Sequence, residues 1–261
     1  MTGRVALPVM TLWWREVVRF RRQRSRLVGA FAQPLLFWVL LGGGFRASFR
    51  PPGTPAGIDS LQYFYPGILA LTLLFTAIFA TISTVEDRRE GFLQGVLVAP
   101  VARGSVVLGQ ALGGTSLAVL QAGLMLGLAP AAGIAVSLPS VLATVAVMAL
   151  VAFGLTSLGL AMAWRLESTQ GFHAIMNLIL IPIWFLSGAF FPASGAPPWL
   201  AWAMWLDPLT YGMAALRRCL YLGDPAGAGA VPAFLPSLLV TLVFGIAAFL
   251  AATLAARRHT A

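Results

Sequence analysis

The stretch EDRREGFLQGVLVAPVARGSVVLGQ, residues Glu86 to Gln110, determines how the rest of the chain is interpreted. It is a long charged interruption between two strongly apolar runs. Its first five residues mix acidic and basic side chains, and an apolar stripe at helical spacing follows. The other loops expected on the same side of the membrane are short, so one charge-headed amphipathic segment there favours a docking surface for a soluble partner.

The composition places the chain among membrane proteins. Of its 261 residues, 59% are hydrophobic and 10% are charged, and the mean hydropathy is +0.87. Ordinary soluble domains carry about 25% charged residues. The net charge of +9 comes from arginines that lie between apolar runs, so membrane topology explains it better than nucleic-acid binding. We expect no nucleic-acid partner.

Apolar runs of membrane-spanning length recur along the chain. They cover Val28–Phe45, Tyr63–Thr84, Val106–Leu128, Pro139–Trp164, Phe172–Phe191 and Phe234–Ala256. Uncharged runs of this length satisfy their backbone hydrogen bonds internally as helices. Within the third run, Gly109 with Gly113 and Gly123 with Gly127 offer faces for close helix packing. The predicted fold class is therefore an all-α membrane protein with six transmembrane helices.

The placement of arginine predicts the orientation. With the N-terminus inside, 13 of the 17 arginines lie in cytoplasmic segments, and the other four, Arg46, Arg50, Arg217 and Arg218, lie outside. Positive charge is enriched on the cytoplasmic side of membrane proteins. Both termini are therefore expected in the cytoplasm.

Residues 1–27 predict an amphipathic helix at the membrane interface, ahead of a single transmembrane domain over residues 28–261. One face of this helix carries Val9, Trp13, Val17 and Phe20, and the opposite face carries Arg15, Arg19, Arg22 and Arg26. An arginine-rich amphipathic helix of this kind lies in the interface plane. The residues lack the continuous apolar core of a cleavable signal peptide. The helix either anchors the topology or binds a partner, and the sequence leaves both roles open.

Residues 86–103 predict a short cytoplasmic helix parallel to the membrane. Its candidate docking residues are Glu86, Asp87, Arg88, Arg89, Glu90, Phe92, Leu93, Val96, Leu97, Pro100 and Arg103. Gly91 and Gly95 loosen this helix, and Pro100 ends it. A short helix held between two spans can transmit a push from a soluble domain. It is otherwise a simple interfacial helix without a partner.

The segment before the last span predicts broken, re-entrant helices on the outer side, at about residues 192–218. Trp199, Trp202 and Trp205 recur every three residues, as in helices at a water–lipid boundary. The surrounding prolines break any continuous span, and broken helices at membrane depth require burial in protein or a cavity. The candidate residues of an outer gate are Pro192, Trp199, Asp207, Pro208 and Tyr211.

Residues that carry catalytic chemistry are scarce. The absence of lysine excludes a Walker A phosphate loop and a lysine Schiff base. Cys219 is the single cysteine, and His173 and His259 lie far apart, so no metal site is predicted. None of the eight acidic residues lies in the middle of a span, which counts against an ion-coupled carrier. The polar pathway candidates within the spans are Thr76, Gln121 and Asn177.

Three ordered blocks carry a family resemblance across most of the chain. They are Arg15-Glu16 with Gln33-Pro34-Leu35-Leu36-Phe37; Gly91, Leu93, Leu97, Ala99-Pro100-Val101, Arg103 and Leu108-Gly109; and Ser187-Gly188, Pro192, Pro197-Pro198-Trp199-Leu200, Asp207-Pro208-Leu209-Thr210-Tyr211 and Ala215-Leu216-Arg217. With six spans, this set resembles ABC-2-type permeases, the membrane half of ATP-binding-cassette exporters of the drug-resistance and nodulation-factor type. The chain departs from that family at three positions. Gln94 stands where an acidic residue is frequent, Ala99 where Thr or Ser is usual, and Asp207 where Asn is more common.

The resemblance implies partners and roles. In such permeases the segment after the second span is the coupling helix that seats in a cleft of the ATPase. The N-terminal helix lies beside it, with Arg15, Glu16, Arg19 and Arg22 as its interface residues. The resemblance further implies two copies of an ABC ATPase that bind ATP and Mg, no cofactor in this chain, and a second permease as homodimer or heterodimer. The setting it implies is the bacterial cytoplasmic membrane.

The expected function is the permease subunit of an ATP-driven exporter, without an ATPase site of its own. Its expected substrate is amphipathic, lipid-like or a glycan. Two alternatives stay open: an ion-coupled secondary carrier, which would respond to an ion gradient, and a passive channel or scaffold, which would need no ATPase.

Overall fold

The computed structural model describes residues 3–22, 24–45, 58–99, 101–224 and 227–258. Every regular element within these ranges is a helix, which confirms the all-α prediction. The elements are α1 (Gly3–Arg22), α2 (Arg24–Gly44), α3 (Ser60–Ala80), α4 (Ile82–Arg89), α5 (Phe92–Val98), α6 (Arg103–Leu126), η1 (Ala129–Ala132), α7 (Leu138–Ala163), α8 (Thr169–Trp184), η2 (Phe185–Ala189), η3 (Ala193–Gly195), α9 (Pro198–Leu206), α10 (Pro208–Leu220) and α11 (Phe234–Arg258).

Within the described residues, five helical stretches are long and apolar enough to cross a membrane. They are Ser60–Arg89, Arg103–Leu126, Leu138–Ala163, Thr169–Ala189 and Phe234–Arg257. These stretches correspond to the second to sixth apolar runs of the sequence. The first run, Val28–Phe45, falls on α2, whose apolar part is the shorter stretch Phe31–Gly44. The count of six spans therefore stays a prediction.

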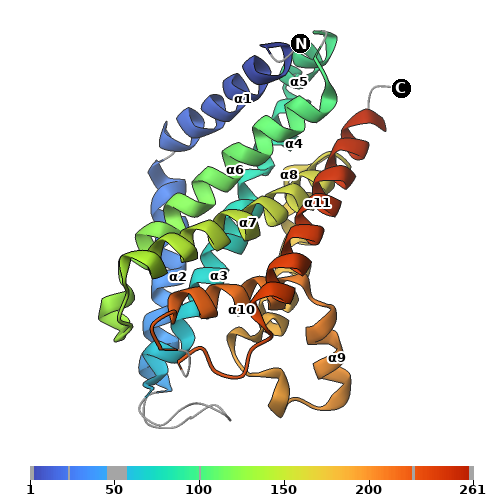
Figure 1. Ribbon diagram of the computed structural model, residues 1–261. Coiled ribbons are helices and arrows are strands. Elements are labelled where there is room, and N and C mark those ends of the chain that lie inside the picture. The colour runs from blue at the N-terminus through green and yellow to red at the C-terminus, as the bar shows by residue number, and fades with distance from the viewer. Residues whose placement is uncertain (1–2, 23, 46–57, 100, 225–226, 259–261) are drawn as a thin grey trace.

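The central helix of the bundle is α3 (Figure 1). It contacts α2, α6, α7, α8 and α10. Tyr65, Leu73 and Leu74 on this helix are completely buried. Neighbouring helices, and not lipid, cover these side chains, and a helix that is apolar on all its faces suits such a central position. The other spans therefore pack around α3, and its residues form the middle of the main hydrophobic core.

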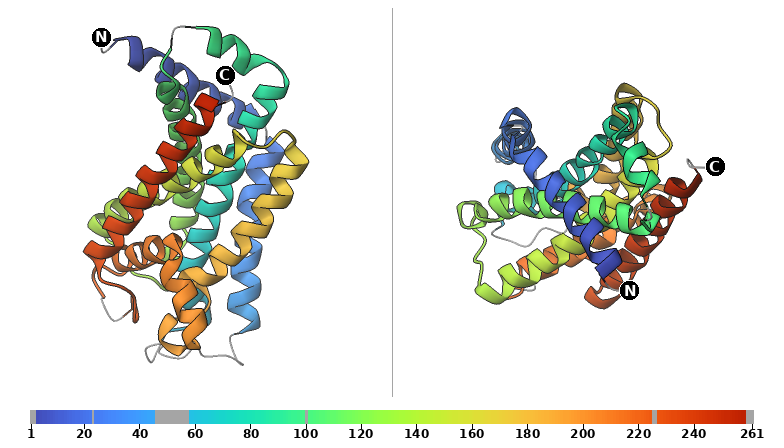
Figure 2. Two further views of the ribbon diagram at one scale, coloured as in Figure 1. Left: turned by 90° about the vertical axis from the view of Figure 1, so that its right-hand side faces the viewer. Right: turned by 90° about the horizontal axis from the view of Figure 1, so that it is seen from above.

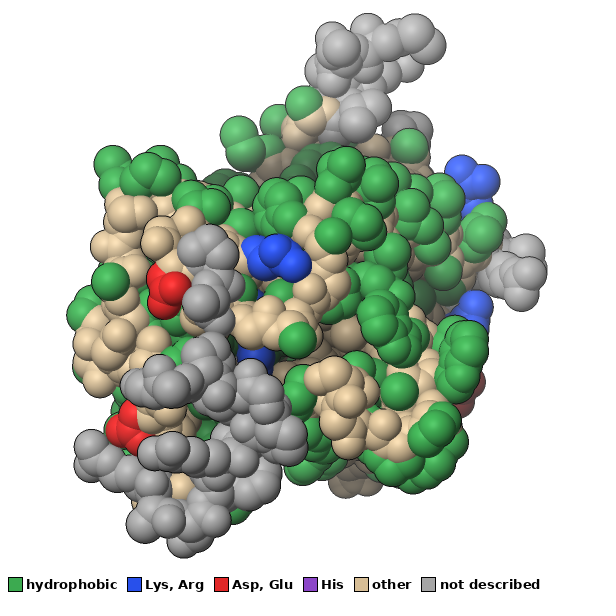
Figure 3. Space-filling view, turned by 60° about the horizontal axis from the view of Figure 1, so that its bottom comes forward, with side chains coloured by type: hydrophobic (Ala, Val, Ile, Leu, Met, Phe, Trp, Pro, Cys, Tyr) green, Lys and Arg blue, Asp and Glu red, His purple; other side chains and the backbone are tan. Residues whose placement is uncertain are grey.

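The two ends of the bundle differ (Figures 1 and 2). Both termini lie at one end together with α5, and α1 lies across this end at an angle to α2. We call it the inner end, after the predicted orientation. The opposite, outer end holds α9 and α10. Figure 3 brings the outer end forward and shows arginine side chains set among hydrophobic ones.

The fifth predicted run ends in a broken helix at the outer end. After α8 the chain forms the π-turn η2, in which Gly188 has φ +82°, a left-handed conformation that glycine adopts without strain. The short helices η3, α9 and α10 follow, so the predicted break in helical structure is present. The break begins at Phe185, before Pro192, because the turn at Gly188 redirects the chain first. The depth of these helices in a membrane stays a prediction.

Helix α1 packs on α6 through the predicted pair of glycines. A Cβ atom at Gly109 would lie 2.9 Å from the Cβ of Leu12, and one at Gly113 would lie 2.7 Å from the Cβ of Glu16. Glycine at these two positions therefore allows the two backbones to approach closely. The second pair behaves differently, because a Cβ at Gly123 would meet nothing within 4 Å.

We predict that Gly113→Ala destabilises the protein, because the added methyl group must push α1 away from α6. Overpacking of this kind costs about 1–3 kcal/mol. The matched control is Gly123→Ala on the same helix, where the new methyl group has free space. Thermal unfolding of the purified variants measures the difference. Equal unfolding temperatures for the two variants would contradict this account of the contact.

Candidate functional site

The arginines of α1 and the acidic residues of α4 form one ion-pair cluster at the inner end. The Asp87 carboxylate has no exposed surface and accepts two hydrogen bonds from Arg15, at 2.5 Å and 2.6 Å. Arg19 donates to the same carboxylate at 2.9 Å and also pairs with Glu86. A buried carboxylate needs such partners, because an unpaired charge away from water is costly. The cluster therefore fixes α1 against α4.

Helix α1 makes further contacts with α4 and also contacts α5. The guanidinium carbon of Arg15 lies 3.9 Å from the centre of the Phe92 ring, within the range of a cation–π interaction. Glu16 accepts a hydrogen bond from Ser83 at 3.0 Å, and burial raises the pKa of the Glu16 carboxyl. Arg22 is exposed at the end of α1. Arg15, Glu16 and Arg19 thus contact α4 and α5, whereas Arg22 is exposed at the end of the helix.

Arg88 connects α4 to the inner end of α7. Its guanidinium donates to the backbone oxygens of Ala163, Trp164 and Leu166, at 3.0 Å, 2.9 Å and 3.2 Å. The last carbonyl groups of a helix lack partners within that helix, and a cation placed there satisfies them. Consecutive residues of α4 therefore hold α1 on one side and α7 on the other.

Helix α5 has a buried side and an exposed side. Gly91, with φ +79°, forms the turn from α4 into α5. Leu93 is 1% exposed and packs in the inner hydrophobic cluster with Trp164. Val96 is half-buried, whereas Val98 is 87% exposed. The predicted helix is thus present. Leu93, which packs in the protein interior, and Val98, which is exposed, are only five positions apart.

The predicted docking residues divide according to their exposure. Asp87 and Leu93 are buried, and the guanidinium of Arg88 is hydrogen-bonded to backbone oxygens at the end of α7. Of the predicted residues, Arg89, Glu90 and Phe92 are exposed, and Arg103 begins α6. Gln94 and Val98, which were not among the predicted docking residues, are exposed on α5 as well. A cavity of about 330 Å³ beside α5 is lined in part by Arg89, Leu93, Gln94, Trp164 and Glu167. Pro100 and the side chain of Leu97 lie outside the part of the chain that the structure describes.

The predicted gate residues at the outer end hold α9 and α10 together. Asp207 caps α10 by accepting from the backbone N–H of Leu209 at 3.0 Å, and Pro208 occupies the first turn. The Tyr211 hydroxyl donates to the backbone oxygen of Trp205 at 3.0 Å. Trp199 is 72% exposed on α9. A gating role for these residues stays a prediction.

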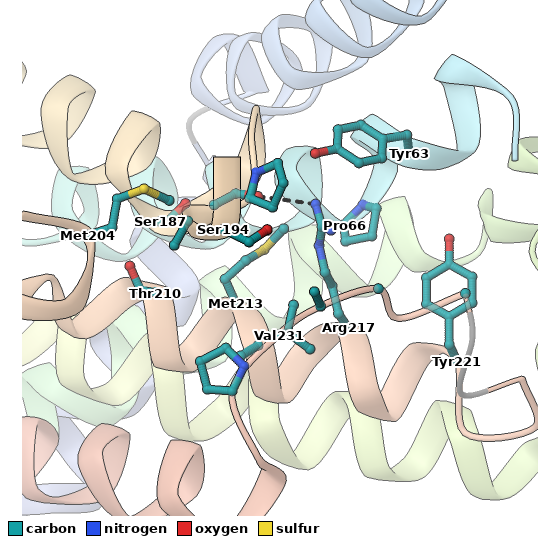
Figure 4. A pocket seen from close by; sticks show the side chains of 18 of the residues that line it. Tyr63, Pro66, Ser187, Ser194, Met204, Thr210, Met213, Arg217, Tyr221 and Val231 are labelled. Carbon is teal, nitrogen blue, oxygen red and sulfur yellow. Dashed lines mark hydrogen bonds between the residues drawn. The ribbon is translucent and has the colours of Figure 1, made fainter. Parts of the chain in front are cut away.

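Next to these residues lies a cavity of about 460 Å³, which is lined by residues of α3, η2, α9, α10 and the segment 227–232. Pro192 contributes to its wall, and Arg217 reaches into it from α10 (Figure 4). The sequence indicated Arg217 only as an outer charge and as part of the resemblance. The sequence did contain a feature that marks this residue, because an arginine among the apolar residues of α10 is rarely buried without a partner for its charge.

Two of the three interior pathway candidates are in contact. The Thr76 hydroxyl donates a hydrogen bond to the side-chain oxygen of Gln121 between α3 and α6, and both residues are buried. Asn177 lies on the exposed face of α8. The pair and Asn177 thus differ in exposure, and a pathway role for the three residues stays a prediction.

We predict that Asp207→Asn changes the dependence of stability on pH. Burial raises the pKa of Asp207 from 3.8 to about 7. The folded chain therefore holds a proton that the unfolded chain releases, so the unfolding free energy should fall as pH rises from about 4 to about 7 and then level off. Asparagine retains an oxygen that can accept from Leu209 but cannot ionise, so the variant should lack this part of the slope.

Unfolding of both proteins, measured from about pH 5 to about pH 8, checks this expectation, because the difference between them isolates Asp207. Parallel curves over that range would show that the Asp207 carboxyl does not titrate there.

The chain is similar to known transport proteins over most of its length. Residues 8–221 match the family model described as ABC-2 type transporter. A putative transport permease, ycf38, of Cyanophora paradoxa is 29% identical over 208 residues, which cover 78% of this chain and 70% of the relative. Nodulation protein J of Rhizobium leguminosarum bv. trifolii is 28% identical over 219 residues, covering 83% and 82%. The chain therefore belongs to the ABC-2 type transporter family.

Proposed function

We propose that the chain is the permease subunit of an ATP-driven exporter and that a separate ATPase drives it through α5. Membership in the family implies an ABC ATPase partner and a membrane setting. The observation that carries the proposal is the connection of α5 and α4 to two other helices. Phe92 meets Arg15 of α1, Asp87 pairs with the same arginine, and Arg88 holds the end of α7.

The exposed side of α5 supplies the contact surface for the ATPase in this proposal. Val98 exposes an apolar side chain almost completely, Gln94 lies one helical turn before it on α5, and Arg89 and Glu90 are exposed at the end of α4. Phe92 is also partly exposed on α5, and apolar side chains bordered by polar ones are typical of a protein interface. Movement of the ATPase would be transmitted through the backbone into α4. The ion pairs of Asp87 and the cap formed by Arg88 would then carry it to α1 and α7.

A second permease subunit is part of the proposal, and it would face α8. This helix leaves His173 and Asn177 exposed, together with the apolar Leu178 and Ile181. Polar side chains within a span are unfavourable against lipid, so such a face usually contacts protein or a water-filled space. Two copies placed with these faces inward would enclose a pathway between them, with one ATPase under each.

We place this assembly in the bacterial cytoplasmic membrane, with both termini in the cytoplasm. The excess of arginine in the predicted inner segments supports this orientation. The exposed tryptophans of α9 support a position for the outer end at the level of the lipid headgroups. The substrate class proposed is an amphipathic, lipid-like or glycan molecule.

We predict that Val98→Asp abolishes association with the ATPase while membrane insertion stays normal. The substitution places a charge at an exposed apolar contact without disturbing the core. Leu93→Asp is not a suitable test, because Leu93 is buried and its loss would unfold the inner cluster. The matched control is Leu222→Asp, which adds the same charge to an exposed leucine at the outer end.

The measurement is the amount of ABC ATPase subunit that co-purifies with each tagged variant from membranes that contain both chains. The expected result is loss of the ATPase with Val98→Asp and normal recovery with Leu222→Asp. Normal recovery with both variants would show that α5 is not the docking surface.

A further inference from the structure

The outer cavity contains a buried cation without a counter-ion. Arg217 is 7% exposed, and its guanidinium donates to the backbone oxygen of Gly188 at 3.2 Å. The ring of Tyr63 lies 5.2 Å from the guanidinium carbon, and the Nε atom of Arg217 has no hydrogen-bond partner. Among the residues that the structure describes, no carboxylate lies within ion-pair distance of this side chain.

This arrangement leaves most of the capacity of the guanidinium unused. An arginine has five N–H donors in a planar fork, which fits a phosphate or carboxylate group. One backbone oxygen, the ring of Tyr63 and the Tyr63 hydroxyl compensate only part of the cost of burying the charge. The neighbouring Arg218 differs, because it donates to the backbone oxygens of Val231 and Pro232. An anion beside Arg217 would supply the missing partner.

The rest of the cavity wall is largely apolar. Pro66, Met204, Met213 and Val231 line it, and Figure 4 shows Arg217 extending among them toward Tyr63. A pocket with an apolar wall and one charged group suits a ligand that has both an apolar part and an anionic part. Inorganic anions alone would leave most of this surface without contacts.

The cavity also adjoins the part of the molecule expected at the membrane surface. Trp205 lines the cavity and, with Pro198, Ala201 and Trp202, a surface groove on α9. Trp199 and Trp202 are 72% and 71% exposed on the same helix. Tryptophan side chains of this kind sit at the level of the lipid headgroups. A molecule at that level would therefore lie beside the cavity.

We infer that the outer cavity binds the anionic headgroup of an amphipathic molecule, a phosphate or carboxylate, and that Arg217 recognises its charge. The apolar part of the ligand lies against the methionine and proline side chains and toward α9. The inference specifies the substrate class of the transport function proposed above and rests on that proposal.

The test is direct binding to the purified full chain in neutral detergent, without the ATPase. Tryptophan fluorescence is followed during titration with short-chain phosphatidylglycerol and with phosphatidylcholine of the same acyl chains. The anionic lipid should bind at least about tenfold more tightly, a difference of about 1.4 kcal/mol. Arg217→Gln should lose this preference. Arg165→Gln, which removes an exposed arginine at the inner end, should keep it.

A second variant keeps the test decisive if Arg217→Gln does not fold. Ser194 is an exposed residue of the cavity wall, so Ser194→Leu should narrow the cavity and weaken binding of phosphatidylglycerol while Arg217 stays in place and the tryptophan signal is unaltered. Unchanged binding by this variant, or an unchanged preference in a folded Arg217→Gln protein, would overturn the inference. Inorganic phosphate should compete only weakly, and competition as strong as that of the lipid would overturn the amphipathic part.

Failure of this inference is distinguishable from failure of the proposed function. A chain that associates with its ATPase but shows no headgroup preference would overturn only the assignment of Arg217. A chain that binds the anionic lipid as expected, but whose α5 does not dock an ATPase, would overturn the transport proposal and leave the binding site intact.

Discussion

The buried carboxylate of Asp87 is the constraint on which the inner end depends. It has no exposed surface, and Arg15 and Arg19 of α1 supply its hydrogen bonds. Removing the partners of a buried charge costs on the order of 3–5 kcal/mol, so α1 cannot leave α4 without a large penalty. The close contact of α1 with α6 through Gly109 and Gly113 brings the arginines within reach. Charge and helix packing thus fix the same position of α1.

The outer end is organised differently, by helix caps and breaks. Gly188 redirects the chain after α8, and Asp207 begins α10. This arrangement leaves Arg217 buried in a cavity with only partial compensation for its charge. The buried carboxylate at the inner end is therefore paired within the chain, whereas the buried guanidinium at the outer end has no ion-pair partner among the described residues. In the proposed exporter, the first end receives force from the ATPase, and the second contacts the substrate.

Hydropathy and length were sufficient to predict the helical class, and five of the six predicted spans correspond to helices of spanning length. The short helix Phe92–Val98 was also predictable, because Pro100 and the charged segment limit it on both sides. The pairing of Asp87 with Arg15 was not, since 72 positions separate them and either could have faced solvent. Leu93 was expected on a docking face, but a seven-residue helix has no reliable face, and the position of Trp164 decides its burial. In the sequence, Arg217 served only as one of the arginines that predict the orientation, and such a count does not tell whether a side chain is exposed or buried.

The central claim is that Asp87 holds α1, α4 and α5 as one unit. Spin labels at Leu7→Cys on α1 and Val98→Cys on α5, both at exposed positions, report the distance between these helices by double electron–electron resonance. The buried Cys219 is replaced by alanine to avoid labelling there. We predict one narrow distance distribution with Asp87 present and a broad one in Asp87→Asn. The same narrow distribution in both proteins would contradict the claim.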